Sequence, residues 1–448
     1  RVSQVSRLVE IDSHLLAAPQ ELSGGQKQRV SLAGVLIDDV EILLFDEPLA
    51  NLDPATGRYA MEMIDDLARG TGATVIIIEH RIEDVLWRPG DRVILVDEGR
   101  IIEDTTSDKI LAAGILQKYG IREPLYVTAL SYAGIQLNDT MRLSHPSQID
   151  ACAIKEPLSC WYRQAVKENP TKEQDIVLSV SDISFSYIPE REVLHQISFD
   201  IRRNEMTAIV GKNGAGKSTL SKLICGFEKP TSGEILLEGE KLTGISIRER
   251  ADKIGFVMQN PNQMISQVMI RDEVGFALKL RDVPKSEVDD RVNEVLKTCG
   301  LYPFRNWPIS TLSYGQKKRV TIAAILVQNP EIIILDEPTA GQDFRHYTEI
   351  MEFLQSLQEK GITILLISHD MHLILEYTKR AIVIADGRLI ADDSPARVLT
   401  DKTIIRPANL KETSLLTLAN KAGIENPFNF VNHFIAVDRE ARHKLCRP

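Results

Sequence analysis

The chain has 448 residues, which allows two to four domains at about 150 residues each. Hydrophobic residues make up 43% and charged residues 26%, so disordered and collagen-like classes are excluded. The formal net charge of −10 argues against a broad basic surface for nucleic acid. No apolar run approaches the ~18 residues that span a bilayer. The five cysteines are too few and too scattered for a disulfide framework.

The first predicted elements belong to one copy of an internal repeat. The string LSGGQKQRV begins at Leu22, and LSYGQKKRV begins 290 positions later at Leu312. The strings EILLFDEP and EIIILDEP have the same separation, and His80 and His369 lie 289 positions apart. The chain therefore contains two tandem copies of one unit. A phosphate loop of the first copy would fall about 80 residues before Arg1, so we expect the native chain to begin upstream.

Residues 141–175 separate the two copies. They hold five Lys/Arg and five Asp/Glu, with prolines at 146, 157 and 170. This composition predicts a linker of mixed order. We therefore divide the chain into three parts: residues 1–140 are the C-terminal part of a first unit, residues 141–175 are the linker, and residues 176–448 are a complete second unit. The C-terminal extension of the second unit is expected from about residue 400.

The second copy predicts strands that alternate with helices. The patterns predict strands at residues 177–187, 206–210, 254–258, 332–335 and 362–367. They predict helices at residues 219–225, 288–299 and 351–357. Ser286 is predicted as the N-cap of the second of these helices, and Gly300 follows its end. The alternation predicts an α/β fold with a mainly parallel sheet.

A glycine-rich loop lies between the strand predicted at 206–210 and the helix predicted at 219–225. Its sequence, GKNGAGKST, matches G-x-x-x-x-G-K-[ST]. Glycines let backbone amides approach phosphate oxygens, Lys217 adds a positive charge, and the Ser218 hydroxyl can reach Mg²⁺. The predicted phosphate-binding residues are Gly211, Lys212, Asn213, Gly214, Ala215, Gly216, Lys217, Ser218 and Thr219.

Three polar residues follow neighbouring predicted strands. Asp336 comes at the carboxyl end of a buried strand, where ligands bind in α/β sheets, and can hold Mg²⁺. Glu337 follows it and can polarise an attacking water. His369 ends the next strand and can contact a γ-phosphate or orient the water.

Two further residues carry weaker signals. Gln259 follows the strand at 254–258, and its amide can contact Mg²⁺ or water and sense a nucleotide. Tyr187 can stack on adenine, or can simply pack on its neighbours in a strand. The LSGGQ string places a hydroxyl and glycines at a predicted helix start, which is an anion site. A second anion site in each unit makes sense if it serves a neighbouring unit.

Together these motifs resemble those of the ATP-binding cassette (ABC) ATPases, over nearly the whole chain. The resemblance implies a P-loop NTPase fold with an antiparallel β subdomain and an α-helical subdomain in each unit, and ATP and Mg²⁺ as ligands. In this family, ATP lies between the phosphate loop of one cassette and the LSGGQ of another. The implied catalytic residues are Glu337, His369, Glu47 and His80. The implied ATP-binding residues outside the phosphate loop are Tyr187, Gln259, Ser23, Gly24, Gly25, Gln26, Ser313 and Gly315. The implied D-loop residues are Asp53 and Asp343, and the implied Mg²⁺ ligands are Ser218, Gln259 and Asp336.

The second LSGGQ departs from the family pattern. Tyr314 replaces its first glycine, while Ser313 and Gly315 remain. Contact with phosphate is therefore expected at this motif, and whether its site hydrolyses ATP is left open.

The sequences LSGGQKQRVSLAGVL and VMQNPNQ, and the extensions at 115–135 and 410–442, resemble the energy-coupling-factor (ECF) branch, which includes importers of vitamins (thiamine precursors) or cobalt. This implies an ATP-hydrolysing subunit, peripheral on the cytoplasmic face of the bacterial membrane. Its partners would be integral membrane coupling and substrate-binding subunits, with cassettes pairing in one chain or with a dimer mate, and no nucleic acid. The alternative is a soluble tandem ABC ATPase that acts on the ribosome. Such proteins use a long charged helical linker, unlike the short neutral stretch at 141–175.

Overall fold

The computed structural model describes residues 40–49, 54–86, 90–163, 175–340 and 342–445, residues 52 and 88, and scattered positions within residues 2–35. The chain forms two compact units. The first comprises Arg1–Ala165 with Lys411–Val431, and the second Val166–Leu410 with Asn432–Pro448. The sequence predicts that residues 411–431 belong to the second unit, whereas in the structure they belong to the first.

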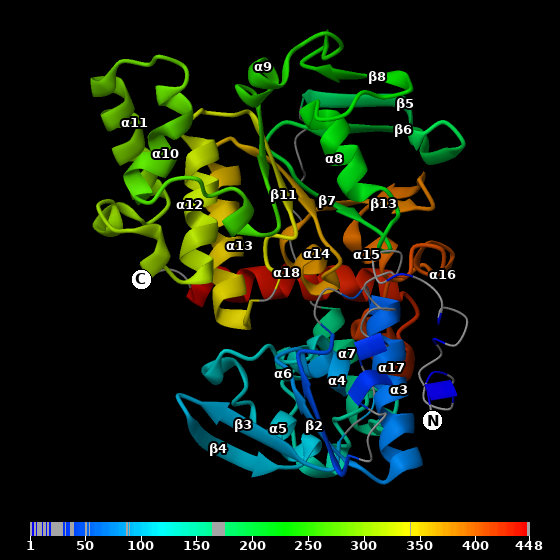
Figure 1. Ribbon diagram of the computed structural model, residues 1–448. Helices are drawn as coiled ribbons and strands as arrows, with labels where there is room; N and C mark the ends of the chain where they lie inside the picture. The colour runs from blue at the N-terminus through cyan, green and yellow to red at the C-terminus, as the bar shows by residue number, and fades with distance from the viewer. Residues whose placement is uncertain are drawn as a thin grey trace. The chain divides into compact units, whose positions relative to one another are not determined.

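The second unit contains a six-stranded sheet (Figure 1). Its strand order is β10 (Ile254–Val257), β11 (Ile332–Asp336), β12 (Thr363–Ile367), β7 (Met206–Val210), β13 (Arg380–Ala385) and β14 (Arg388–Asp393). The first five strands are parallel, and β14 pairs antiparallel with β13. The strands β7 and β12 are buried along their whole length, as continuous apolar runs in a covered parallel sheet require. The predicted α/β fold with a mainly parallel sheet is confirmed.

A separate four-stranded antiparallel sheet lies in the same unit. Its order is β6 (Arg191–Arg202), β5 (Ile176–Ile188), β8 (Ser232–Leu237) and β9 (Glu240–Lys241). The helix α8 (Lys217–Cys225) contributes Leu220, Leu223 and Ile224 to a core that also includes residues of both sheets. This shared core fixes the start of α8, and hence the loop before it, against the large sheet.

A helical insert follows β10. The helices α10 (Ile270–Lys279), α11 (Lys285–Thr298) and α12 (Tyr314–Leu326) pack together, and Figure 1 shows them grouped beside the sheet. The N-cap predicted at Ser286 is wrong: α11 begins at Lys285, with Pro284 as its N-cap. The backbone of Pro284 (φ −55°, ψ 139°) is extended, so the helix starts at the following residue. The helix predicted at 351–357 lies within α13 (Phe344–Glu359), mostly in its C-terminal half.

The first unit holds a parallel pair, β1 (Ile42–Asp46) and β2 (Thr74–Ile78), and an antiparallel hairpin, β3 (Val93–Asp97) and β4 (Arg100–Thr105). Its helices are α3 (Pro54–Thr71), α4 (Ile82–Val85), α5 (Ser107–Ala113), α6 (Leu125–Tyr132), α7 (Ala151–Tyr162) and α17 (Ser414–Ala422). The other α-helices that the described residues form are α9 (Ile247–Ala251), α14 (Met371–Tyr377), α15 (Pro395–Val398), α16 (Lys402–Ile405) and α18 (Pro427–Leu445).

The stretch predicted as a linker contains a packed helix. In the first unit, α17 packs against α6 and α7, and the ring of Phe430 meets the edge of Trp161 with centroids 5.7 Å apart. Residues 151–162 are therefore part of the folded first unit rather than a linker. Among the described residues, no helix combines the length and apolar character needed to cross a bilayer.

Candidate functional site

The glycine-rich loop connects β7 to α8 in the second unit. Gly211 has φ +146°, and a Cβ added there would lie 1.9 Å from the carbonyl oxygen of Ile384. Gly216 has φ +101°, and its added Cβ would lie 2.5 Å from a methyl group of Leu194. Both positions therefore require glycine, for backbone conformation and for space. The loop packs too closely on its neighbours for side chains at these positions, so its shape is fixed before any ligand binds.

The Lys217 side chain curls back over this loop. Its Nζ donates to the carbonyl oxygens of Gly211 (2.7 Å) and Lys212 (2.9 Å), and the side chain is largely buried. The Lys212 ammonium in turn pairs with Asp386 at 2.5 Å. The charge of Lys217 is therefore held at the inner side of the loop, a position suited to phosphate oxygens.

Asp336 faces the start of α8. The Ser218 hydroxyl donates to its Oδ2 at 3.4 Å, so two predicted Mg²⁺ ligands lie together. Burial raises the pKa of the Asp336 carboxyl above its usual value, and the nearby Glu337 carboxylate raises it further. A partly buried pair of carboxylates favours a cation, and hydroxyl and carboxylate oxygens are the donors that Mg²⁺ prefers. These residues therefore fit a magnesium ion.

Glu337 and His369 form a close pair at the carboxyl ends of β11 and β12. His369 Nδ1 lies 2.6 Å from Glu337 Oε1, and both side chains are largely buried. The Glu337 backbone has φ +45°, an uncommon conformation, and its N–H donates to the Ile367 carbonyl at 2.9 Å. Strain held in place by neighbouring strands is typical of functional residues.

The first unit repeats this arrangement. Glu47 also has φ +45°, and its N–H donates to the Ile78 carbonyl at 2.9 Å. His80 Nδ1 lies 3.6 Å from Glu47 Oε1, with more exposed side chains than in the second unit. The two copies therefore share the local backbone, but the first pair is longer than a hydrogen bond.

Gln259 follows β10, as predicted, and its backbone contacts α12. The Gln259 carbonyl accepts from Tyr314 Oη at 3.3 Å and from Lys318 Nζ at 2.8 Å. Lys318 Nζ also donates to the Met258 carbonyl at 2.7 Å. Burial lowers the pKa of Lys318 to about 8, although Asp336 and Glu337 act in the opposite direction.

Sequence analysis assigned no role to Lys318. Its spacing is a weak signal, since Lys318 lies three and four positions before Thr321 and Ile322, which the structure shows to be buried, and its carbonyl partners cannot be read from the sequence. A lysine on the apolar face of a helix needs partners for its charge.

The LSYGQ motif opens α12 as predicted. Ser313 is the N-cap, and it forms a capping box with Gln316. Gly315 lies in the first turn, where an added Cβ would lie 3.6 Å from Gln342 Oε1. Asp343 is the N-cap of α13, and its carboxylate accepts from the His346 N–H at 2.8 Å.

Tyr187 lies at the end of β5, and half of its side chain is exposed. Its ring packs edge-on against Phe185 with centroids 4.8 Å apart, and its Oη lies 3.3 Å from Thr219 Oγ1 in the phosphate loop. An exposed ring beside this loop leaves room for stacking on a base, so both interpretations of Tyr187 remain compatible.

The phosphate loop, Asp336, Glu337 and His369 thus meet at the carboxyl edge of the sheet in the second unit. Five predicted site residues of the first copy lie outside the described residues: Ser23, Gly24, Gly25, Gln26 and Asp53.

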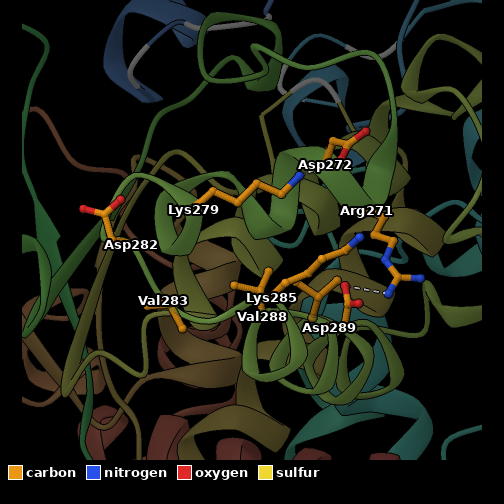
Figure 2. Close-up of a pocket in the computed structure, with 9 residues that line it drawn as sticks. Arg271, Asp272, Lys279, Asp282, Val283, Lys285, Val288 and Asp289 are labelled. Carbon is orange, nitrogen blue, oxygen red and sulfur yellow. Dashed lines mark hydrogen bonds and ion pairs between the residues drawn. The ribbon is translucent and has the colours of Figure 1, made fainter.

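An open hollow of about 840 Å³ lies in the helical insert, away from these loops. Figure 2 shows its lining, with Arg271 ion-paired to Asp289 at 2.8 Å across α10 and α11. The other lining residues are Asp272, Lys279, Asp282, Val283, Lys285, Val288 and Val292. The hollow therefore presents both signs of charge around a small valine surface.

Two family models match the chain. The one described as ABC transporter matches residues 2–50 and 194–340. The one described as ATP-binding cassette cobalt transporter matches residues 113–185. The matched solved structures include cbiO1 from Clostridium perfringens, described as part of the ABC transporter complex cbiONQ. It is 37% identical, and the alignment covers 53% of this chain and 95% of that chain with a TM-score of 0.49.

Full-length relatives give the clearest assignment. An ABC transporter ATP-binding protein of Clostridium perfringens is 56% identical over 99% of this chain and 78% of its own length. One from Enterococcus faecalis is 56% identical over 98% of this chain and 78% of its own. One from Vibrio parahaemolyticus is 50% identical over 99% of this chain and 77% of its own. On this similarity, and with the ABC motifs of the second copy and those of the first copy from LSGGQ onward in order, the chain belongs to the ABC transporter ATP-binding proteins and is an ATPase.

Proposed function

We propose that this chain is the ATP-hydrolysing subunit of an ECF-type importer for a metal ion or a vitamin. One observation supports this proposal most strongly: the phosphate loop, Asp336, Glu337 and His369 lie together at one edge of the sheet. The chain also belongs to the transporter ATPases. The ribosomal alternative gains no support from the relatives, which are transporter proteins.

In this proposal, the loop amides and Lys217 bind the ATP phosphates, and Tyr187 stacks on the adenine. Ser218, Asp336 and Gln259 hold Mg²⁺, which would neutralise charge on the outer phosphates. The Glu337 carboxylate lies where it can accept a proton from the attacking water. The hydrogen bond from His369 fixes the direction of that carboxylate, because Nδ1 and Oε1 are only 2.6 Å apart.

The motifs also support a composite site. Ser23, Gly24, Gly25 and Gln26, with Asp53, would close over ATP bound to the second unit. Ser313 and Gly315, with Asp343, would serve the opposite site beside Glu47 and His80. A hydroxyl and backbone amides at a helix start bind anions, which supports this role for Ser313. The second cassette would pair in this way within the chain or with a dimer mate.

The membrane partner would dock on the helical insert. In this proposal, the ATPase passes its conformational change to a membrane subunit. The hollow between α10 and α11 offers three basic and three acidic side chains, which suits a polar cytoplasmic segment of an integral membrane coupling subunit. The chain would then lie on the cytoplasmic face of the bacterial membrane as a peripheral subunit, with a separate membrane component binding the cargo.

The match of residues 113–185 to the cobalt-transporter family supports a metal ion as the cargo. Uptake of radiolabelled Co²⁺ and of thiamine precursors by cells with and without this protein tests the cargo directly. We expect Co²⁺ uptake to be lost, whereas loss of thiamine-precursor uptake alone would favour the vitamin. Affinity purification in mild detergent tests the partner. We expect a small integral membrane protein to co-purify, and Arg271→Glu to reduce it; recovery of ribosomes instead would overturn the proposal.

A further inference from the structure

A buried lysine joins the LSYGQ helix to the segment after β10 in the second unit. Lys318 is fully buried, and its ammonium donates to two successive backbone carbonyls, those of Met258 (2.7 Å) and Gln259 (2.8 Å). A charged group is costly to bury, and hydrogen bonds to a charged donor are stronger than neutral ones. These two bonds therefore hold the backbone at 258–259 firmly against α12.

Tyr314 adds a third bond to the same place. It lies one helical turn before Lys318, and its hydroxyl donates to the Gln259 carbonyl at 3.3 Å. The residue that makes the second motif depart from LSGGQ thus has a contact that a glycine could not make.

The first copy differs at both positions. Its motif has Gly24 and Gln28 where the second has Tyr314 and Lys318. Neither a phenol nor an ammonium is available at these two positions, so the same hydrogen bonds cannot form. The hydrogen bonds from Tyr314 and Lys318 are therefore specific to the second copy.

We propose that Tyr314 and Lys318 are positioning residues, which hold the Gln259 backbone so that its amide is correctly placed toward bound Mg·ATP. This rests on the proposed role of Gln259 at the magnesium site. Since Ser313 is the N-cap of α12, the same hydrogen bonds make the LSYGQ motif follow the nucleotide state of its own unit. The tyrosine that replaces the first glycine then couples the LSYGQ motif to Gln259, and is more than the loss of a glycine.

The test compares Lys318→Met with Lys317→Met. The first removes the donors while keeping the shape of a buried side chain, and the second removes a neighbouring, partly buried lysine from the same helix. Hydrogen exchange of the peptide covering residues 254–263, in the absence of ligand, should become faster in Lys318→Met and stay unchanged in Lys317→Met. Mg·ATP affinity, measured with a fluorescent ATP analogue, should fall about 10-fold in Lys318→Met, as is typical when a partner of a metal ligand is lost. Affinity for ATP without Mg²⁺ should not change.

A double-mutant cycle separates positioning from general damage. In a Gln259→Ala background there is no amide to position, so Lys318→Met should have no further effect on Mg·ATP affinity. An equal loss in both backgrounds would overturn the proposal. Tyr314→Phe, which keeps the ring and removes one hydrogen bond, should weaken Mg·ATP binding about twofold and decides the matter if Lys318→Met does not fold. If the unsubstituted protein fails to bind Mg·ATP, the proposed function is overturned as well. If the unsubstituted protein binds Mg·ATP and the variants bind it equally well, only this inference is overturned.

Discussion

The Glu337→Gln variant tests the proposed chemistry most directly. The carboxylate is largely buried and accepts a 2.6 Å hydrogen bond from His369, while its backbone is pinned to β12. An amide of the same size keeps this geometry but cannot accept a proton from water. General-base catalysis contributes about 10²–10⁴-fold, so we expect turnover to fall by that factor, or about 3–5 kcal/mol in the barrier.

The fold should tolerate this change. The substitution replaces a charge-assisted hydrogen bond by a neutral one of roughly half the strength, which costs about 1 kcal/mol. That is small beside the 5–15 kcal/mol typical of total stability. ATP affinity should be retained, because the loop and Lys217 are untouched, and bound ATP should be trapped.

The assay is steady-state phosphate release with saturating Mg·ATP, alongside equilibrium nucleotide binding. Glu47→Gln is the matched control. Its pair with His80 is 3.6 Å long and its side chain is 43% exposed, so the substitution removes no hydrogen bond. We expect it to leave turnover at the phosphate loop of the second unit largely unchanged, because Glu47 is proposed for the opposite site. Turnover of Glu337→Gln within about threefold of the parent would refute the assignment of Glu337 as the base.

Three further outcomes are expected. Gly211→Ala should abolish nucleotide binding, because its Cβ would lie 1.9 Å from a β13 carbonyl oxygen, whereas Gly214→Ala meets no atom within 4 Å and should bind more weakly but measurably. Burial raises the pKa of Cys225 to about 12, so iodoacetamide at pH 8 should alkylate the exposed Cys152 and spare Cys225, as peptide mass spectrometry would report. Phe430→Ala should destabilise the first unit by about 3–5 kcal/mol, seen as faster hydrogen exchange in α7 and α17 with the six-stranded sheet unchanged.

The strands that frame the site could be predicted because their signals are local. β7 matches its predicted bounds, Met206–Val210, since a continuous apolar run ends there at a glycine. The glycine-rich loop lies between this strand and α8, as the motif requires. These features depend on residues adjacent in the chain.

The features that were missed depend on contacts between distant residues. The helix α7 has a composition resembling a linker, and its buried face is explained by Phe430 and α17, far along the chain. The helix α11 begins one residue before Ser286, because the extended backbone of Pro284 sets its start. Lys318 belonged to a recognised motif, but its partners are carbonyl groups, which carry no side-chain signal in a sequence. The roles assigned to the site residues remain predictions that the variants above address.

Residues 411–431 complete the first unit, and this sets an order on its folding during synthesis. The ribosome makes α7 long before it makes α17, at about 5–20 residues per second, so the delay is on the order of ten seconds or more. During that interval, the apolar face of α7, with Ile154, Leu158 and Trp161, has no α17 to cover it. The first unit is thus completed only after residues 166–410 of the second unit have been made, because it needs Lys411–Val431.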